Sequence, residues 1–128
     1  MKYLSQEFLD EALRISQGFA DRPNANARIQ YVVSGGPDGD VSYYWVLVGG
    51  KLQECKLGEL PDADFSLRMS YDTSVKIQKG DLNPNVAFMT GKMKASGNVG
   101  KLLSLMPLTQ SDDFKSLQEQ LRAKTEYQ

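Results

Sequence analysis

The sequence predicts a small α+β domain that occupies all of residues 1–128. Its length lies within the usual range for one domain. Apolar residues near the N-terminus follow helical spacing, the period changes to two at Arg28, and helical spacing returns after Ser70. Glycine-rich turns separate the alternating stretches, which is typical of hairpins. We therefore expect one helix, four strands, helices, a fifth strand and two final helices, with no internal domain boundary.

The first helix is expected over residues 5–20. Apolar residues such as Phe8, Ala12 and Phe19 recur at helical intervals, so they share one face. Ser5 is a suitable N-cap. Pro23 ends the segment, because proline disfavours the helical conformation in the residue before it.

The next three elements are expected to be strands over residues 28–33, 41–48 and 51–57. The first stretch alternates between its two faces, and aromatic and β-branched residues fill the second. Gly49 and Gly50 supply the positive φ angles that a two-residue turn requires. The three strands are therefore predicted to form an antiparallel meander.

The second half of the chain is expected to contain short, capped helices. Before them, Phe65, Leu67 and Met69 alternate with polar residues and predict a fourth strand, and residues 92–96 predict a fifth. Four residues are suitable N-caps for the helices, namely Ser70, Asn83, Asn98 and Ser111. Pro107 is expected to end the helix that Asn98 begins.

The charge balance and the hydropathy argue against two classes of partner. The chain has 15 basic and 16 acidic residues, interspersed along its length, so no nucleic-acid-binding face is expected. No stretch approaches the roughly 20 apolar residues of a spanning helix, and the acidic N-terminal segment is unlike a secretory signal. The single cysteine, Cys55, fits a reducing compartment. We therefore expect a cytoplasmic protein without an integral membrane segment.

The absence of histidine argues against catalysis. It removes the commonest general base and the commonest metal ligand, so Ser-His pairs, Cys-His pairs and zinc sites are excluded. The pairs of acidic residues fall in turns or at a helix start, where solvated carboxylates are usual. Residues 97–101 do not fit the phosphate-loop pattern. We expect no catalytic residue, no metal site and no cofactor.

Methionines gather in the apolar segments of the second half, at Met69, Met89, Met93 and Met106. Because methionine adapts its shape, such a cluster can line a pocket that accepts varied apolar ligands. Core packing is the plainer interpretation of the same pattern.

The last predicted helix carries an apolar stripe of Phe114, Leu117 and Leu121. Three interpretations of this stripe are open. It can close a cavity as a lid, bind a partner chain, or form the last layer of the core.

Three segments of the sequence carry a family resemblance: DFSLRMS at residues 64–70, GDLNP at 80–84 and AFMTGKMKASGN at 87–98. Together with the leucines that follow, they resemble the sterol carrier protein type 2 family over about residues 28–106. The most specific part is the block NPNVAFMTGKMKASGN. The chain departs from the family's more apolar pattern at Ser74 and Gln78.

The resemblance implies a five-stranded, mainly antiparallel sheet with helices packed on one face, enclosing an apolar cavity for a sterol, fatty acid or fatty acyl-CoA. It implies no enzymatic activity. Lys92, Lys94 and Lys101 are candidates for contact with an anionic head group, although solvation is the plainer role. The residues expected to line the cavity are Phe65, Leu67, Met69, Val75, Phe88, Met89, Met93, Leu102, Leu103, Met106, Phe114 and Leu117.

The leading hypothesis is therefore a lipid-binding or lipid-transfer protein. The alternative is a non-catalytic interaction or accessory subunit with a filled core, which forms a homodimer or associates with an enzyme. A cavity and a bound lipid favour the first hypothesis, and a fully packed interior favours the second.

Overall fold

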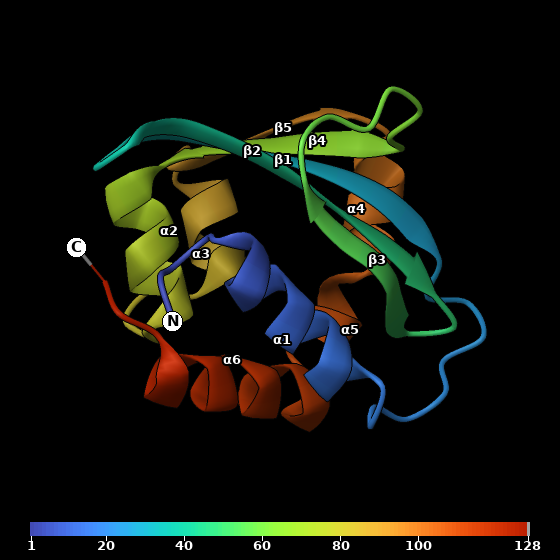
Figure 1. Cartoon of the computed structure of the whole chain (residues 1–128). Coiled ribbons are helices and arrows are strands. Elements are labelled where there is room, and N and C mark those ends of the chain that lie inside the picture. Colours follow the sequence, from blue (N-terminus) through green and yellow to red (C-terminus); the bar gives the residue numbers. More distant parts are fainter. Residues whose placement is uncertain (128) are drawn as a thin grey trace.

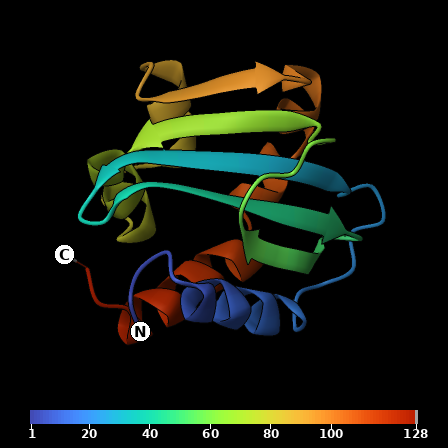
Figure 2. The ribbon, with the colours of Figure 1, turned by 45° about the horizontal axis from the view of Figure 1, so that its top comes forward.

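The computed structural model describes residues 1–127 and shows a curved sheet with helices gathered on one face (Figure 1). The strands are β1 (Ala27–Gly36), β2 (Gly39–Val48), β3 (Lys51–Leu57), β4 (Phe65–Ser70) and β5 (Met93–Gly97). Their order across the sheet is β3-β2-β1-β4-β5, as Figure 2 shows from the outer face. Of these five strands, β1 and β4 pair in parallel, and the other neighbouring strands are antiparallel. The expected α+β class and mainly antiparallel sheet are confirmed.

The helices are α1 (Gln6–Ser16), α2 (Tyr71–Gln78), α3 (Pro84–Met89), α4 (Val99–Ser104), α5 (Met106–Thr109) and α6 (Asp112–Lys124). Every N-cap expected from the sequence is confirmed, because its side-chain oxygen accepts a hydrogen bond from a backbone N–H in the first turn. These residues are Ser5, Ser70, Asn83, Asn98 and Ser111.

Two helix ends differ from the prediction. The first helix stops at Ser16, four residues early, because Gly18 follows and the backbone tightens into bonds from Gly18 N to Ile15 O and from Phe19 N to Ser16 O. Pro107 does not end the helix capped by Asn98. That helix ends at Ser104. Pro107 lies in the first turn of α5, where a backbone N–H would have no partner within the helix, so the N–H that proline lacks is not missed.

The turn between β2 and β3 has the expected geometry. Gly49 and Gly50 have φ angles of 63° and 86°, a region that residues with a side chain rarely adopt. Val48 pairs with Lys51 across the turn. This tight connection brings β3 back antiparallel to β2.

The core lies between the inner face of the sheet and the helices. Along β4, Phe65, Leu67 and Met69 are buried, whereas Arg68 between them is exposed. On the helical side, Leu117 and Leu121 of α6 are only 2% and 3% exposed. Of the three interpretations of the α6 stripe, the structure therefore favours core packing for these two leucines.

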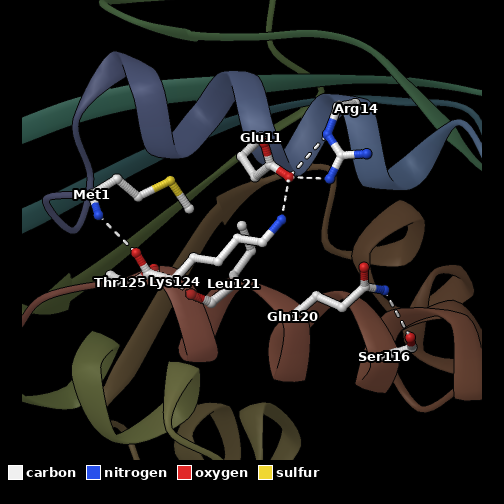
Figure 3. A network of polar contacts seen from close by, with 8 residues as sticks. All are labelled: Met1, Glu11, Arg14, Ser116, Gln120, Leu121, Lys124 and Thr125. Atoms are coloured by element: carbon white, nitrogen blue, oxygen red, sulfur yellow. Dashed lines mark hydrogen bonds and ion pairs between the residues drawn. The ribbon is translucent and has the colours of Figure 1, made fainter.

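The two ends of the chain meet where α1 and α6 run side by side (Figure 1). In Figure 3, Glu11 Oε1 of α1 accepts hydrogen bonds from Arg14 Nε at 2.9 Å and from Lys124 Nζ of α6 at 3.0 Å. The amino group of Met1 donates to the carbonyl of Lys124 at 2.7 Å. These contacts hold α6 against α1 and thus over the sheet.

Candidate functional site

A partly open pocket of about 120 Å³, here called the main cavity, lies between the sheet and the helices. One wall comes from the sheet: Tyr31, Tyr43, Trp45, Leu67, Met69 and Met93. The other comes from Tyr3 and the helices: Ser74, Ile77, Gln78, Pro84, Asn85, Phe88, Leu102, Met106, Thr109, Phe114 and Gln118. Segments from both halves of the sequence therefore build one apolar chamber.

Strand pairing explains the sheet wall. Tyr31 of β1 lies opposite Tyr43 of β2 and Leu67 of β4, so the three side chains point to the same face. The rings of Tyr31 and Tyr43 stack with their centroids 4.7 Å apart. Trp45 lies two residues beyond Tyr43 on the same face, 5.1 Å from the Tyr31 ring.

A second chamber of about 60 Å³, here called the inner cavity, lies next to the main cavity. The two share six lining residues, namely Tyr31, Trp45, Leu67, Leu102, Thr109 and Phe114. The rings of Trp45 and Phe114 meet edge to face with centroids 6.2 Å apart. Aromatic side chains therefore form part of the partition between the chambers.

Helix α2 contributes two polar side chains, Ser74 and Gln78, to the main cavity. Ser74, Ile77 and Gln78 are spaced three and four residues apart, so one face of α2 lines the chamber. The Tyr3 hydroxyl donates to the carbonyl of Ser74 at 3.3 Å. The amide nitrogen of Gln78 is buried and has no hydrogen-bond partner among residues 1–127.

Both chambers are electrically neutral. None of their lining residues is Lys, Arg, Asp or Glu. Burial raises the pKa of Tyr31 and the pKa of Tyr43 well above the ordinary phenol value, so both hydroxyls stay protonated. A buried carboxylate would have no cation to pair with here and would cost several kcal/mol. The chambers therefore suit the apolar part of a ligand.

An open, more polar groove of about 460 Å³ adjoins the main cavity. It shares Ile77, Pro84, Thr109 and Gln118 with that cavity. Its charged lining residues all lie on α6: Lys115, Glu119 and Arg122. We call it the cationic groove, since two of the three charges are positive.

The structure brings most of the expected cavity residues together. The main cavity is lined by seven of them: Leu67, Met69, Phe88, Met93, Leu102, Met106 and Phe114. Phe65 and Leu117 line the inner cavity. Their contact with a ligand stays a proposal.

Val75, Met89 and Leu103 line neither chamber. Met89 is 82% exposed and Leu103 is 49% exposed. Each follows a residue that does face the main cavity, Phe88 or Leu102, and one step along a helix turns the side chain by about 100°. Val75 follows Ser74 in the same way and packs beside the core.

Sequence reasoning missed the aromatic residues on the sheet wall. Tyr31, Tyr43 and Trp45 lie within the strands predicted over residues 28–33 and 41–48, but none of them is among the residues expected to line the cavity. The alternation along each strand was the signal that could have found them, and the turn at residues 36–39 places β1 beside β2 so that Tyr31 lies opposite Tyr43. The contribution of Tyr3 had no local signal, because it depends on the N-terminal segment packing against α2.

No reactive centre is found among the residues that the structure describes. Burial raises the pKa of the Cys55 thiol to about 12, with Asp10 adding to the effect, so Cys55 is not a thiolate nucleophile at neutral pH. Residues 1–127 contain no cluster of three His, Cys, Asp or Glu side chains able to hold a metal. Three lysines were candidates for contact with a head group. Lys101 forms an ion pair with Asp64, with 3.5 Å between Nζ and Oδ2. Lys92 and Lys94 are exposed and line neither cavity nor the cationic groove.

No helix within residues 1–127 combines the length and apolarity needed to cross a membrane.

Similar solved structures share this fold. A protein from Thermus thermophilus superposes with a TM-score of 0.74 at 20% identity, over 98% of this chain and 91% of that one. A crystal structure of sterol carrier protein 2 superposes with a TM-score of 0.71 at 20% identity, over 94% of this chain and 98% of that one. Palmitated SCP2L2 from Aedes aegypti superposes with a TM-score of 0.61 at 16% identity, over 84% of this chain and 96% of that one. At these identities the likeness shows the fold alone.

Sequence comparison identifies the family. Hydroxysteroid dehydrogenase-like protein 2 of Mus musculus is 41% identical over 61 residues, which cover 47% of this chain. The match takes up only 12% of that much longer protein. The model of the SCP-2 sterol transfer family matches residues 11–110, most of the chain. The chain therefore belongs to the SCP-2 sterol transfer family.

Proposed function

We propose that the protein binds a lipid-like molecule, such as a fatty acid, a fatty acyl-CoA or a sterol-like compound, and acts as a carrier rather than an enzyme. The observation that carries this proposal is the uncharged main cavity between the sheet and the helices. Family membership supports it. So does the fold shared with the palmitated Aedes aegypti protein.

The driving force would be removal of apolar ligand surface from water. Each Å² buried contributes about 25 cal/mol, before the cost of ordering the ligand is subtracted. The main cavity of about 120 Å³ is close to the ~150 Å³ apolar cavity that accepts benzene, and below the ~300 Å³ of small-molecule pockets. A longer ligand would therefore have to join the main and inner cavities.

We place this opening at the aromatic partition. Trp45 and Phe114 line both cavities and contact each other edge to face. Rotation of either ring would connect the chambers without moving the sheet. Phe114 lies in the first turn of α6, so this turn would act as the adjustable cover, while Leu117 and Leu121 anchor the rest of the helix in the core.

The test is a titration followed by the fluorescence of Trp45, the single tryptophan in the chain. We expect added lauric acid to change the intensity and wavelength of emission and to saturate at one molecule per chain. Phe114→Ala should change the size of the Trp45 fluorescence response and the rate at which lauric acid is released, while the protein stays folded. A fluorescence signal that does not respond to lauric acid, palmitic acid or cholesterol would contradict the proposal.

The second candidate is an accessory subunit that associates with an enzyme. Its support is the mouse relative, in which the similar segment occupies a small part of a long chain named as dehydrogenase-like. This role is compatible with lipid binding if the domain presents a ligand to an enzyme. Binding of lipid by the isolated chain distinguishes a carrier from a subunit with a filled core.

We also propose the cytoplasm as the location of the protein.

A further inference from the structure

We propose that the cationic groove binds the anionic head group of an amphiphilic ligand, a carboxylate or a phosphate, held by Lys115 and Arg122 while the apolar tail enters the main cavity. This inference rests on the proposed function, and it fixes the orientation of the ligand. It also places the head group on α6 rather than at the lysines of β5.

The first argument is continuity. Four residues, Ile77, Pro84, Thr109 and Gln118, line both the groove and the main cavity. A single molecule can therefore occupy both spaces if its polar and apolar parts are adjacent. The groove volume of about 460 Å³ exceeds what a carboxylate needs and also has room for a phosphate group.

The second argument is the separation of charge. The chambers contain no cation, so a carboxylate or phosphate inside them would be buried without a partner. The groove provides cations directly outside. An anionic amphiphile can thus place both parts in suitable surroundings, with the tail inside and the head in the groove.

The third argument is how α6 presents its charges. One face of α6 lines the groove, because its lining residues follow Lys115 at helical intervals of three, four and seven positions. These residues are Gln118, Glu119 and Arg122. Neither Lys115 nor Arg122 forms an ion pair within residues 1–127, whereas Lys124 on another face pairs with Glu11. Glu119 is the one carboxylate lining the groove, and it leaves an excess of positive charge.

The fourth argument is the placement of Arg122. Its Nε donates to the carbonyl of Gln78 at 3.3 Å, which holds the guanidinium beside the end of α2. Gly80 has a φ of 81°, and a Cβ there would lie 3.2 Å from Arg122 Nη2. The glycine therefore leaves the space in which the guanidinium lies, and the Nη groups stay free to donate to an anion.

The experiment compares ligands that differ only in the head group. Laurate, lauroyl-CoA and dodecanol share a chain of the same length, and Trp45 fluorescence measures the dissociation constant of each. The test variant is Lys115→Gln with Arg122→Gln. The matched control is Lys92→Gln with Lys94→Gln, which removes the same charge from exposed positions on β5 and beside it.

In the test variant we expect the dissociation constant of laurate to rise about fivefold to tenfold, as loss of charge-assisted contacts implies. The constant for dodecanol should change by less than about twofold. In the control variant, both should stay within about twofold of the unaltered protein. A larger loss for lauroyl-CoA than for laurate would identify phosphate as the preferred anion, and an equal loss would show that the groove holds the carboxylate and the phosphates equally well.

Two results would overturn the inference alone: equal loss of laurate and dodecanol binding in the test variant, or equal loss of laurate in the test and control variants. If neither laurate nor dodecanol bound to the unaltered protein, the proposed function would fail together with the inference. A lower affinity for laurate at high salt, without the same change for dodecanol, would support the ionic contact.

Discussion

Leu102 and Leu103 are neighbours on α4, but only Leu102 faces the interior, where it lines both the main and the inner cavity. Leu103 is 49% exposed. The same leucine substitution can therefore be made once inside the cavity and once outside it. Because they adjoin in sequence, local changes in the stability of α4 should be similar for both.

Leu102→Phe should lower the affinity for lauric acid about tenfold, because the larger ring occupies space shared by both cavities and overpacking costs about 1–3 kcal/mol. Leu103→Phe should change the affinity by less than about twofold. Fluorescence titration of Trp45 measures both, and thermal unfolding confirms that both variants fold. Equal loss in the two variants would show that the cavity is not the binding site.

Gln78→Leu should stabilise the protein. The amide nitrogen of Gln78 is buried without a hydrogen-bond partner among residues 1–127, and leaving such a group unpaired costs about 1–3 kcal/mol. We expect the free energy of unfolding in urea to rise by about 1 kcal/mol, and dodecane or dodecanol to bind at least as tightly. Gln120→Leu is the control, since Gln120 is exposed and donates to Ser116. A less stable Gln78→Leu variant would show that the amide has a partner in solution.

Glu11 should make stability depend on pH in the acid range. Hydrogen bonds from Arg14, and then from Lys124, lower the pKa of Glu11 from 4.5 to about 2. Because the folded pKa is the lower one, this stabilisation is present above pH 4.5 and is lost as the pH falls towards 2.

Glu11→Gln should therefore reduce stability at pH 7 by a small amount, up to about 1 kcal/mol as for other surface ion pairs, and the reduction should shrink as the pH falls to 2. Urea unfolding at a series of pH values measures this. Glu59→Gln on the exposed loop after β3 is the control. A Glu11→Gln penalty that is as large at pH 2 as at pH 7 would contradict the ionic account.

Gly97→Ala should destabilise the protein, whereas Gly100→Ala should not. Gly97 has a φ of 95°, and a Cβ there would lie 2.8 Å from the carbonyl oxygen of Asp64, so Gly97→Ala should destabilise by about 1–3 kcal/mol. Gly100 lies within α4, and its Cβ would meet Asn98 Oδ1 at 3.5 Å, an ordinary contact. Gly100→Ala should therefore be neutral or stabilise by up to about 1 kcal/mol. Thermal unfolding of both variants tests the backbone geometry at the start of α4.

Local patterns in the sequence predicted most of the fold. The alternation at Phe65, Leu67 and Met69 identified a strand with one buried face, and serine and asparagine caps identified the helix starts. These signals are local, since they depend on residues within one turn or one strand. The parallel pairing of β1 with β4 had no such signal, because residues far apart in the sequence make it.

The site was predicted only in part for the same reason. Apolar residues of the second half, such as Phe88 and Leu102, do line the main cavity. The exposed Met89 and Leu103 show that hydrophobicity alone does not tell which side of a short helix faces inwards. The cationic groove had no local signal, because Lys115 and Arg122 come to line it only where α6 passes the end of α2.

The central claim is that this chain carries a lipid in its interior. It is tested most directly by native mass spectrometry of protein purified from its own host, followed by solvent extraction and identification of the co-purified apolar compounds. We expect one lipid per chain, released by the Leu102→Phe variant and retained by Leu103→Phe. A mass that matches the polypeptide alone, together with no uptake of added fatty acid or sterol, would contradict the claim and favour an accessory subunit with a filled core.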